Sequence, residues 1–289
     1  MDQLVSGEWL EKELGAPDLR VLDCSVVMEV DPEGRRHYRP GGPNWEQGHI
    51  PGSAHIDLFT QVSDASSPYP FMLPPPEQFG AAMSELGVGD GTRVVLYDAA
   101  VNAWAARMWW MLRAFGFDNA AILDGGWRSW TMDGRPASND PAPSYPPGDF
   151  VARPRPGLFV GKDEVLSAID RPEECIVDAL PQAMYRGELQ DYGRPGHIPG
   201  ARNVPFGNLV DLSTHRYLPR DQLRAAFSEV LSADPDRVIT YCGAAIAASS
   251  DAFVLHLLGV DSVAVYDGSL SEWAADPTLP LTTGPDPLP

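Results

Sequence analysis

The sequence predicts an α/β protein made of two tandem domains of one fold, each a mostly parallel sheet flanked by helices. Three observations predict it: an internal repeat, short β-branched runs that alternate with helical stretches, and a proline-rich segment between the two halves. Such alternation is typical of parallel sheets covered by helices. We therefore expect one domain over residues 1–140 and a second over residues 157–289.

The repeat consists of landmarks that follow one another in the same order in both halves. A Gly-His-Ile-Pro-Gly segment begins at Gly48 and again at Gly196. After it, each half carries an apolar run and then an Asp-Gly-x-x-x-x-Trp segment. These pairs are 93–97 with 237–241, and 124–130 with 267–273. A unit that recurs in this way predicts two domains with the same topology.

The segment 141–156 is the predicted linker. Its prolines stand at positions 141, 143, 146, 147, 154 and 156. Each proline fixes φ and removes a backbone donor, so we expect the linker to be stiff and extended.

Composition and charge exclude several classes of function. With 289 residues, of which 44% are apolar, the chain is long enough to bury two cores. Its formal net charge of -19 argues against binding to nucleic acid or to an anionic membrane. Three cysteines make no disulfide framework, and the N-terminus has neither the basic nor the apolar region of a signal peptide, so we expect a cytoplasmic protein. Neither CxxC nor HExxH occurs, so we expect no metal and no other cofactor.

Cys242 is the residue from which most of the functional interpretation follows. The run 237–241 is typical of a buried strand, small residues follow the cysteine, and 249–258 is a helical run. A thiol in this place faces the free N–H groups of a helix N-terminus, which favour an anion. We therefore expect a thiolate nucleophile. The alternative is a small buried apolar residue, which is the role that we expect for Cys24 and Cys175.

Asp98 occupies the position in the first half that corresponds to Cys242. A carboxylate has no sulfur and forms no persulfide. Only the second half is therefore expected to carry out thiol chemistry at this position.

These features together resemble the tandem-domain rhodanese family, the thiosulfate and 3-mercaptopyruvate sulfurtransferases. The resemblance covers nearly the whole chain and implies two rhodanese-like domains, of which the second is catalytic. It implies that Cys242 takes the outer sulfur of a small anionic donor as a persulfide. A thiol, cyanide or a protein thiol would then accept that sulfur.

Backbone amides in the loop after Cys242 are expected to stabilise both the thiolate and the persulfide. They belong to Gly243, Ala244, Ala245, Ile246, Ala247 and Ala248.

Further residues are expected to bind the substrate or to support the loop. Arg186 and Arg194, together with Tyr185, are the expected ligands of the donor, because guanidinium groups pair with carboxylate and thiosulfonate oxygens. Asp57 is expected either to orient a donor or acceptor or to cap a turn. Asp178 ends a predicted strand and is expected to support the loop or Arg186.

The loop departs from both family patterns. Between Gly243 and Ala248 it has neither the basic residues typical of thiosulfate enzymes nor the hydroxyl groups typical of 3-mercaptopyruvate enzymes. Phe59 and Phe71 align with an aspartate and a histidine of the 3-mercaptopyruvate enzymes. The donor therefore stays open.

Two other functions compete with sulfur transfer. A binding module without turnover is the first, because the loop lacks hydroxyl groups. A cysteine phosphatase is the second, and it is disfavoured because no arginine closes the loop after Cys242 to hold a phosphate.

Several conspicuous residues are interpreted as structural. His49 and His197 occur in both halves, including the half without a catalytic cysteine, so we expect them to stabilise turns. Asp267, Ser269 and Glu272 are interpreted as helix-start residues.

Overall fold

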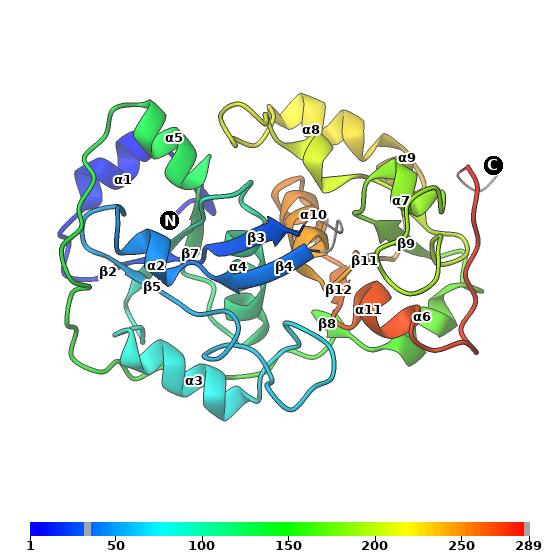
Figure 1. The fold of residues 1–289 in the computed structure, drawn as a ribbon, viewed down its shortest axis with the longest axis horizontal. Helices are drawn as coiled ribbons and strands as arrows, with labels where there is room; N and C mark the ends of the chain where they lie inside the picture. Colours follow the sequence, from blue (N-terminus) through cyan, green and yellow to red (C-terminus); the bar gives the residue numbers. More distant parts are fainter. Residues whose placement is uncertain (32–35, 286–289) are drawn as a thin grey trace. The chain divides into compact units, whose positions relative to one another are not determined.

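The computed structural model describes residues 1–31 and 36–285, and its contacts divide the chain into two compact units (Figure 1). Unit 1 comprises residues 1–66, 73–155 and 212–216. Unit 2 comprises residues 67–72, 156–211 and 217 onward.

Unit 1 contains a five-stranded parallel sheet of order β1-β7-β6-β2-β5. Its strands are β1 (Leu4–Val5), β2 (Leu19–Asp23), β5 (Ser53–His55), β6 (Arg93–Tyr97) and β7 (Ala120–Leu123). An antiparallel hairpin is added by β3 (Val26–Val30) and β4 (Arg36–Pro40). The helices are α1 (Gly7–Glu13), α2 (Gly42–Trp45), α3 (Pro76–Glu85), α4 (Ala103–Ala114) and α5 (Gly126–Met132).

Unit 2 repeats this sheet with the order β8-β12-β11-β9-β10, again parallel throughout. The strands are β8 (Phe159–Val160), β9 (Glu174–Asp178), β10 (Arg202–Asn203), β11 (Arg237–Tyr241) and β12 (Val263–Tyr266). The helices are α6 (Lys162–Ala168), α7 (Gln182–Tyr185), η1 (Phe206–Leu209), α8 (Arg220–Ala226), α9 (Ser228–Ser232), α10 (Ile246–Leu257) and α11 (Ser269–Trp273). The predicted fold class and the predicted repeat are both confirmed.

The central strands β6 and β11 are mostly apolar, as is typical of a parallel sheet whose two faces are covered by helices. Val95 in β6 and Ile239 in β11 are fully buried. The helix after each strand, α4 or α10, ends at a left-handed glycine, Gly116 with φ 91° or Gly259 with φ 92°. Glycine adopts this conformation without the penalty of a Cβ, so both helices end at the same landmark of the repeat.

The histidines of the two Gly-His-Ile-Pro-Gly segments are structural. The His49 ring stacks on Trp45 with 3.9 Å between centroids, and its Nδ1 lies 2.8 Å from the Trp45 carbonyl oxygen. The His197 ring stacks on Tyr185 at 3.5 Å, and its Nδ1 lies 2.7 Å from the Tyr185 carbonyl oxygen. In each half the histidine therefore packs its turn against a buried aromatic ring, which agrees with the predicted role of the histidines in stabilising turns.

Most of the proline-rich segment, up to Arg155, belongs to unit 1. The amide of Arg153 donates to the Phe115 carbonyl at 2.8 Å, and the amide of Arg155 donates to the Ala114 carbonyl at 2.7 Å. Phe150 packs edge-on against Phe79 of α3, with 5.8 Å between ring centroids. These contacts fix the segment to the helical face of unit 1 along α3 and the end of α4.

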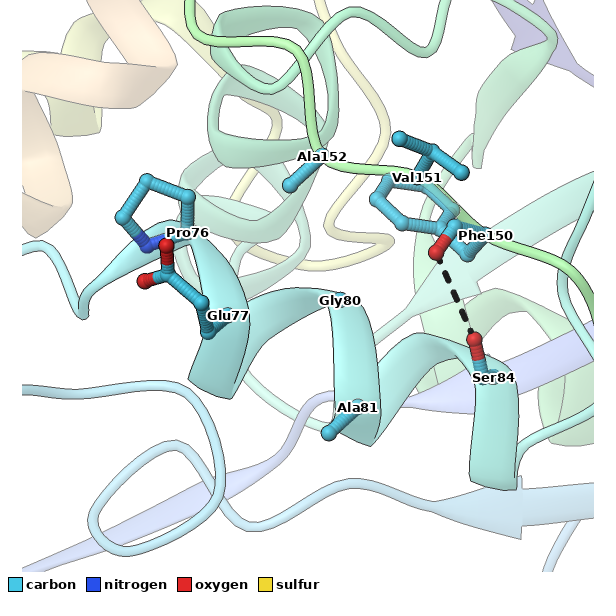
Figure 2. A pocket seen from close by; sticks show the side chains of 8 residues that line it. All are labelled: Pro76, Glu77, Gly80, Ala81, Ser84, Phe150, Val151 and Ala152. Carbon is cyan, nitrogen blue, oxygen red and sulfur yellow. Dashed lines mark hydrogen bonds between the residues drawn. The ribbon is translucent and has the colours of Figure 1, made fainter.

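A groove of about 310 Å³ lies between α3 and the segment 150–152 (Figure 2). Glu77 is the one ionisable residue among those that line it. The hydroxyl of Ser84 donates to the Phe150 carbonyl oxygen at 3.5 Å across the groove. The groove holds no thiol and no cation, so it is not the site at which the predicted chemistry would occur.

Candidate active site

Cys242 lies directly after β11, at the carboxyl end of the central strand of unit 2. Ligands bind to open α/β sheets at this end of the strands. The carbonyl oxygen of Cys242 accepts the amide of Leu270 at 3.0 Å, and its own amide donates to Ser269 Oγ at 3.2 Å. The start of α11 therefore holds the backbone of the cysteine on both sides.

The loop after Cys242 curls because Ala245 adopts a left-handed conformation with φ 60°, and α10 begins at the next residue. The amides of Ala248, Ala244 and Ala247 are the backbone groups that act on the Cys242 thiol and lower its pKa. The amide of Ala245 donates instead to Ser269 Oγ at 3.1 Å. The predicted ring of amides is thus present in part.

The expectation that the resting thiol is ionised needs correction. Cys242 is only 3% exposed, and burial raises the pKa of its thiol above the ordinary value of 9.0. The amides of Ala248, Ala244 and Ala247 lower that pKa, but they do not outweigh burial. The negative charge of Asp178 raises it further. The thiol is therefore the resting form at neutral pH, and the amides act once an anion is present.

Asp98 shows how the same loop in unit 1 binds an anion. Its carboxylate accepts four backbone N–H groups of its own loop, at distances of 2.8 to 3.1 Å. The donors are Ala100, Asn102, Trp104 and Ala105. Asn102 is left-handed with φ 64° and directly precedes α4, just as Ala245 directly precedes α10 with φ 60°. The two residues therefore correspond in the repeat. The amides that face Asp98 and those that face Cys242 therefore occupy corresponding positions.

Tyr192 was not identified from the sequence, and it lies against the loop. A Cβ atom added to Gly243 would lie 1.9 Å from the Tyr192 hydroxyl oxygen and 2.0 Å from its Cζ. The phenol therefore touches the backbone of the residue that follows Cys242. Only the aromatic character of Tyr192, a few residues before a Gly-His-Ile-Pro-Gly segment, could have suggested it.

Two of the predicted substrate ligands have structural roles. Tyr185 is fully buried, and its hydroxyl donates to the Ala201 carbonyl at 2.6 Å. The Arg194 guanidinium donates to four carbonyl oxygens around the end of α11, at 2.7 to 3.0 Å. Those carbonyls belong to Trp273, Ala274, Asp276 and Leu279. Since these contacts engage both side chains, we no longer assign either residue to the donor.

Arg186 and Asp57 meet different outcomes. The Nε of Arg186 is buried and has no hydrogen-bond partner among the described residues, so its N–H group is an unpaired donor. Asp57 lies in unit 1, where its carboxylate accepts the Phe59 amide at 2.8 Å and the Thr60 hydroxyl at 2.6 Å. This is an Asx turn, so the turn alternative describes Asp57 in the structure.

Two buried carboxyl groups lie behind the loop. Asp178 accepts the Leu180 amide on Oδ1 at 2.8 Å, and burial raises its pKa to about 7. Asp251 in α10 is fully buried, and neither of its carboxyl oxygens has a partner among the described residues. Burial and the nearby Asp178 raise the pKa of Asp251 well above its ordinary value. The corresponding residue in α4 is the buried, apolar Met108.

Asp251→Leu is expected to stabilise the protein by about 1–3 kcal/mol at pH 7, because an unpaired buried acid is replaced by an apolar side chain. The folded protein keeps the Asp251 proton above pH 4, whereas the unfolded chain releases it. The part of this cost that arises from proton release in the unfolded chain is therefore absent below the unfolded pKa of Asp251 and grows as the pH rises. Urea unfolding at pH 4 and pH 7 should show the gain mainly at pH 7. Met108→Asp is the matched control and should destabilise unit 1; equal gains at both pH values would contradict this interpretation.

Two stretches of the chain, residues 6–133 and 162–276, match the family model for the rhodanese-like domain. The chain belongs to the rhodanese-like family. This rhodanese-like chain is 35% identical over 284 residues to the 3-mercaptopyruvate sulfurtransferase of Escherichia coli, and the match covers 96% of each chain. It is 32% identical over 280 residues to the thiosulfate sulfurtransferase of Rattus norvegicus, covering 93% of this chain and 91% of the relative.

Structural comparison agrees with the sequence comparison. The crystal structure of SseA, a 3-mercaptopyruvate sulfotransferase from Escherichia coli, superposes with a TM-score of 0.80 at 33% identity. The match covers 93% of this chain and 99% of SseA. The predicted family is confirmed, and the rhodanese-like chain is a sulfurtransferase.

Within residues 1–31 and 36–285, no helix is long and apolar enough to cross a membrane. The same residues contain no cluster of three or more histidine, cysteine, aspartate or glutamate side chains that could hold a metal ion.

Proposed function

We propose that this sulfurtransferase carries sulfur as a persulfide on Cys242. The proposal rests on the correspondence between the Cys242 loop and the Asp98 loop, whose carboxylate accepts three amides at the matching positions. The three matching amides of unit 2, from Ala244, Ala247 and Ala248, lower the pKa of the Cys242 thiol and so favour negative charge there. In unit 1 the corresponding amides hold the oxygens of Asp98, which lie one bond beyond Cγ. An outer sulfur bonded to Cys242 Sγ would occupy the equivalent place, and its negative charge would meet the same donors.

The reaction follows from this arrangement. The Cys242 thiol gives its proton to solvent as the donor binds, and the resulting thiolate attacks the outer sulfur of the donor. The bond between that sulfur and the rest of the donor breaks, and its electron pair leaves with the remainder, as sulfite when the donor is thiosulfate. The persulfide anion then rests on the loop amides until an acceptor thiol or cyanide attacks its outer sulfur and restores the Cys242 thiolate.

The substrate class is a small anion of the thiosulfate or 3-mercaptopyruvate type. The relatives named for these two donors support this class. In this chain Arg186 is the candidate ligand, because its Nε–H donor has no hydrogen-bond partner among the described residues and guanidinium groups pair with anionic oxygens. The acceptor is a thiol, cyanide or a protein thiol. We place the enzyme in the cytoplasm, because its three cysteines are free, as a reducing compartment would keep them.

Intact-mass spectrometry tests the persulfide. Incubation with thiosulfate or 3-mercaptopyruvate is expected to add one sulfur atom, about 32 Da, to the chain, and dithiothreitol should remove it. Cys24→Ser and Cys175→Ser are matched controls, since both residues are buried outside the loop, and both variants should still be labelled. Cys242→Ser should not be labelled. Labelling of Cys242→Ser, or binding of donor without any labelling of the parent, would refute the proposal; the second result would favour a binding module.

A further inference from the structure

Ser269 lies directly beneath the Cys242 loop and is fully buried at the start of α11. Its Oγ accepts the amide of Cys242 at 3.2 Å and the amide of Ala245 at 3.1 Å. The same hydroxyl donates to the Tyr266 carbonyl oxygen at 2.8 Å. One side chain therefore joins the end of β12 to the two residues that bracket the turn of the loop.

The backbone of Ser269 shows that this placement is not a default helix start. Ser269 has φ 49°, a left-handed conformation that L-residues other than Asn and Asp rarely adopt. The corresponding residue of unit 1 is Gly126, with φ 51°, for which the conformation carries no such penalty. Unit 2 thus accepts a strained serine where unit 1 has a glycine. The helix-start interpretation from the sequence misses this contact.

The two loops differ in how they use the equivalent amide. In unit 1 the Asn102 amide donates to the Asp98 carboxylate at 3.1 Å. In unit 2 the equivalent amide, of Ala245, is taken by Ser269 Oγ. Residues 243–248 contain no hydroxyl group, so the hydroxyl that organises this loop comes from α11.

We propose that Ser269 is a positioning residue for Cys242. Its hydroxyl occupies the amides of Cys242 and Ala245 and thereby holds the loop so that the amides of Ala244, Ala247 and Ala248 face the sulfur. The inference rests on the proposed persulfide chemistry of the same site. Without the hydroxyl, two buried N–H groups lose their acceptor. The loop then shifts to satisfy them, and the remaining amides move away from the sulfur.

Ser271 provides a matched control on the same helix. Its amide and its hydroxyl both donate to the Gly243 carbonyl oxygen, at 2.9 and 2.7 Å. Ser271→Ala therefore removes a hydroxyl contact to the same loop but leaves the acceptor of the two loop amides in place. The ionisable groups around the loop are unchanged in all of these variants. They are Asp178 on β9, Asp251 on α10, Tyr192 against Gly243, and Glu272 on α11, which accepts the Tyr266 hydroxyl at 2.7 Å.

The experiment compares the parent enzyme with Ser269→Ala, Ser269→Gly and Ser271→Ala. Two quantities are measured: the rate at which thiosulfate adds sulfur to Cys242, and the pH dependence of Cys242 alkylation by iodoacetamide. Ser269→Ala and Ser269→Gly are expected to slow sulfur loading about tenfold or more and to move the alkylation profile to higher pH. Ser271→Ala should leave the alkylation profile in place.

Ser269→Gly keeps the test decisive if Ser269→Ala does not fold, because glycine removes the hydroxymethyl group and also relieves the left-handed strain. A folded Ser269→Gly enzyme with the parent's loading rate and alkylation profile would overturn the proposal, and so would a shift of the profile to lower pH. Failure of the parent itself to load sulfur on Cys242 would instead refute the proposed function. The alkylation profile needs no sulfur donor, so the two failures are distinguishable.

Discussion

Asp98→Ala is expected to destabilise unit 1 by about 3–5 kcal/mol, which is large for a single substitution. The Asp98 side chain is fully buried, and four loop amides donate to it. Alanine would leave these N–H groups without their acceptor. Each buried donor left unsatisfied costs about 1–3 kcal/mol before relaxation of the loop reduces the sum. Burial raises the pKa of Asp98 to about 6, so the carboxylate is mostly ionised at pH 7 and the lost contacts are charge-assisted.

Urea unfolding followed by tryptophan fluorescence measures this effect, because the helix that follows the Asp98 loop, α4, carries the buried residues Trp104, Trp109 and Trp110. Cys242→Ala is the matched control at the corresponding position of unit 2. A sulfur is a weaker hydrogen-bond acceptor than a carboxylate, so this control should cost clearly less. Equal losses for the two variants would show that the Asp98 contacts contribute little to stability.

Gly243→Ala is expected to reduce sulfur transfer about 100-fold, because a displacement of about 1 Å at a reacting group can have an effect of that size. The new Cβ would lie 1.9 Å from the Tyr192 hydroxyl oxygen, far below any permitted contact. Either Tyr192 leaves the loop or the loop moves with Cys242. Gly243 has no left-handed φ, so backbone strain does not explain a loss.

A double variant separates the two causes of that loss. Tyr192→Ala removes the clashing ring, so Gly243→Ala combined with Tyr192→Ala should transfer sulfur faster than Gly243→Ala alone if the loop moves. If the loss arises only because Tyr192 is expelled, the double variant and Tyr192→Ala will have the same rate. Measurement of kcat and KM with thiosulfate checks both cases. A Gly243→Ala enzyme with the parent's rate would mean that the Tyr192 contact has no part in the reaction.

The sequence predicts the fold well because the repeat is encoded locally. The apolar runs at 93–97 and 237–241 and the Gly-His-Ile-Pro-Gly segments are short signals that each half repeats. The strands β6 and β11 and the two matching turns could therefore be predicted without knowledge of contacts between distant residues. The place of Cys242 at the end of a central strand follows from the same local pattern.

The rest of the site depends on contacts between residues far apart in the chain. Ser269 is 27 residues away from Cys242 in the sequence, and it makes its contact in a left-handed conformation with φ 49°. No sequence pattern predicts a positive φ for a serine. Tyr185 stands beside Arg186 in the sequence, but its ring faces the core and stacks on His197. Arg194 is drawn to the carbonyl oxygens at the end of α11, some 80 residues away. A charge or an aromatic ring near a motif therefore indicates a candidate ligand, and only the fold decides its direction.

The occupied loop of unit 1 determines how much sulfur one chain can hold. A carboxylate tethered to its own anion site acts at an effective concentration in the millimolar range or above, without paying the entropy of association. Free thiosulfate would have to displace the Asp98 carboxylate from these amides. Even then, unit 1 has no thiol at this position that could attack the thiosulfate. The four loop amides of unit 1 are occupied by Asp98. With the persulfide proposed on Cys242, we therefore expect each chain to hold one transferred sulfur atom per cycle, although the fold is duplicated.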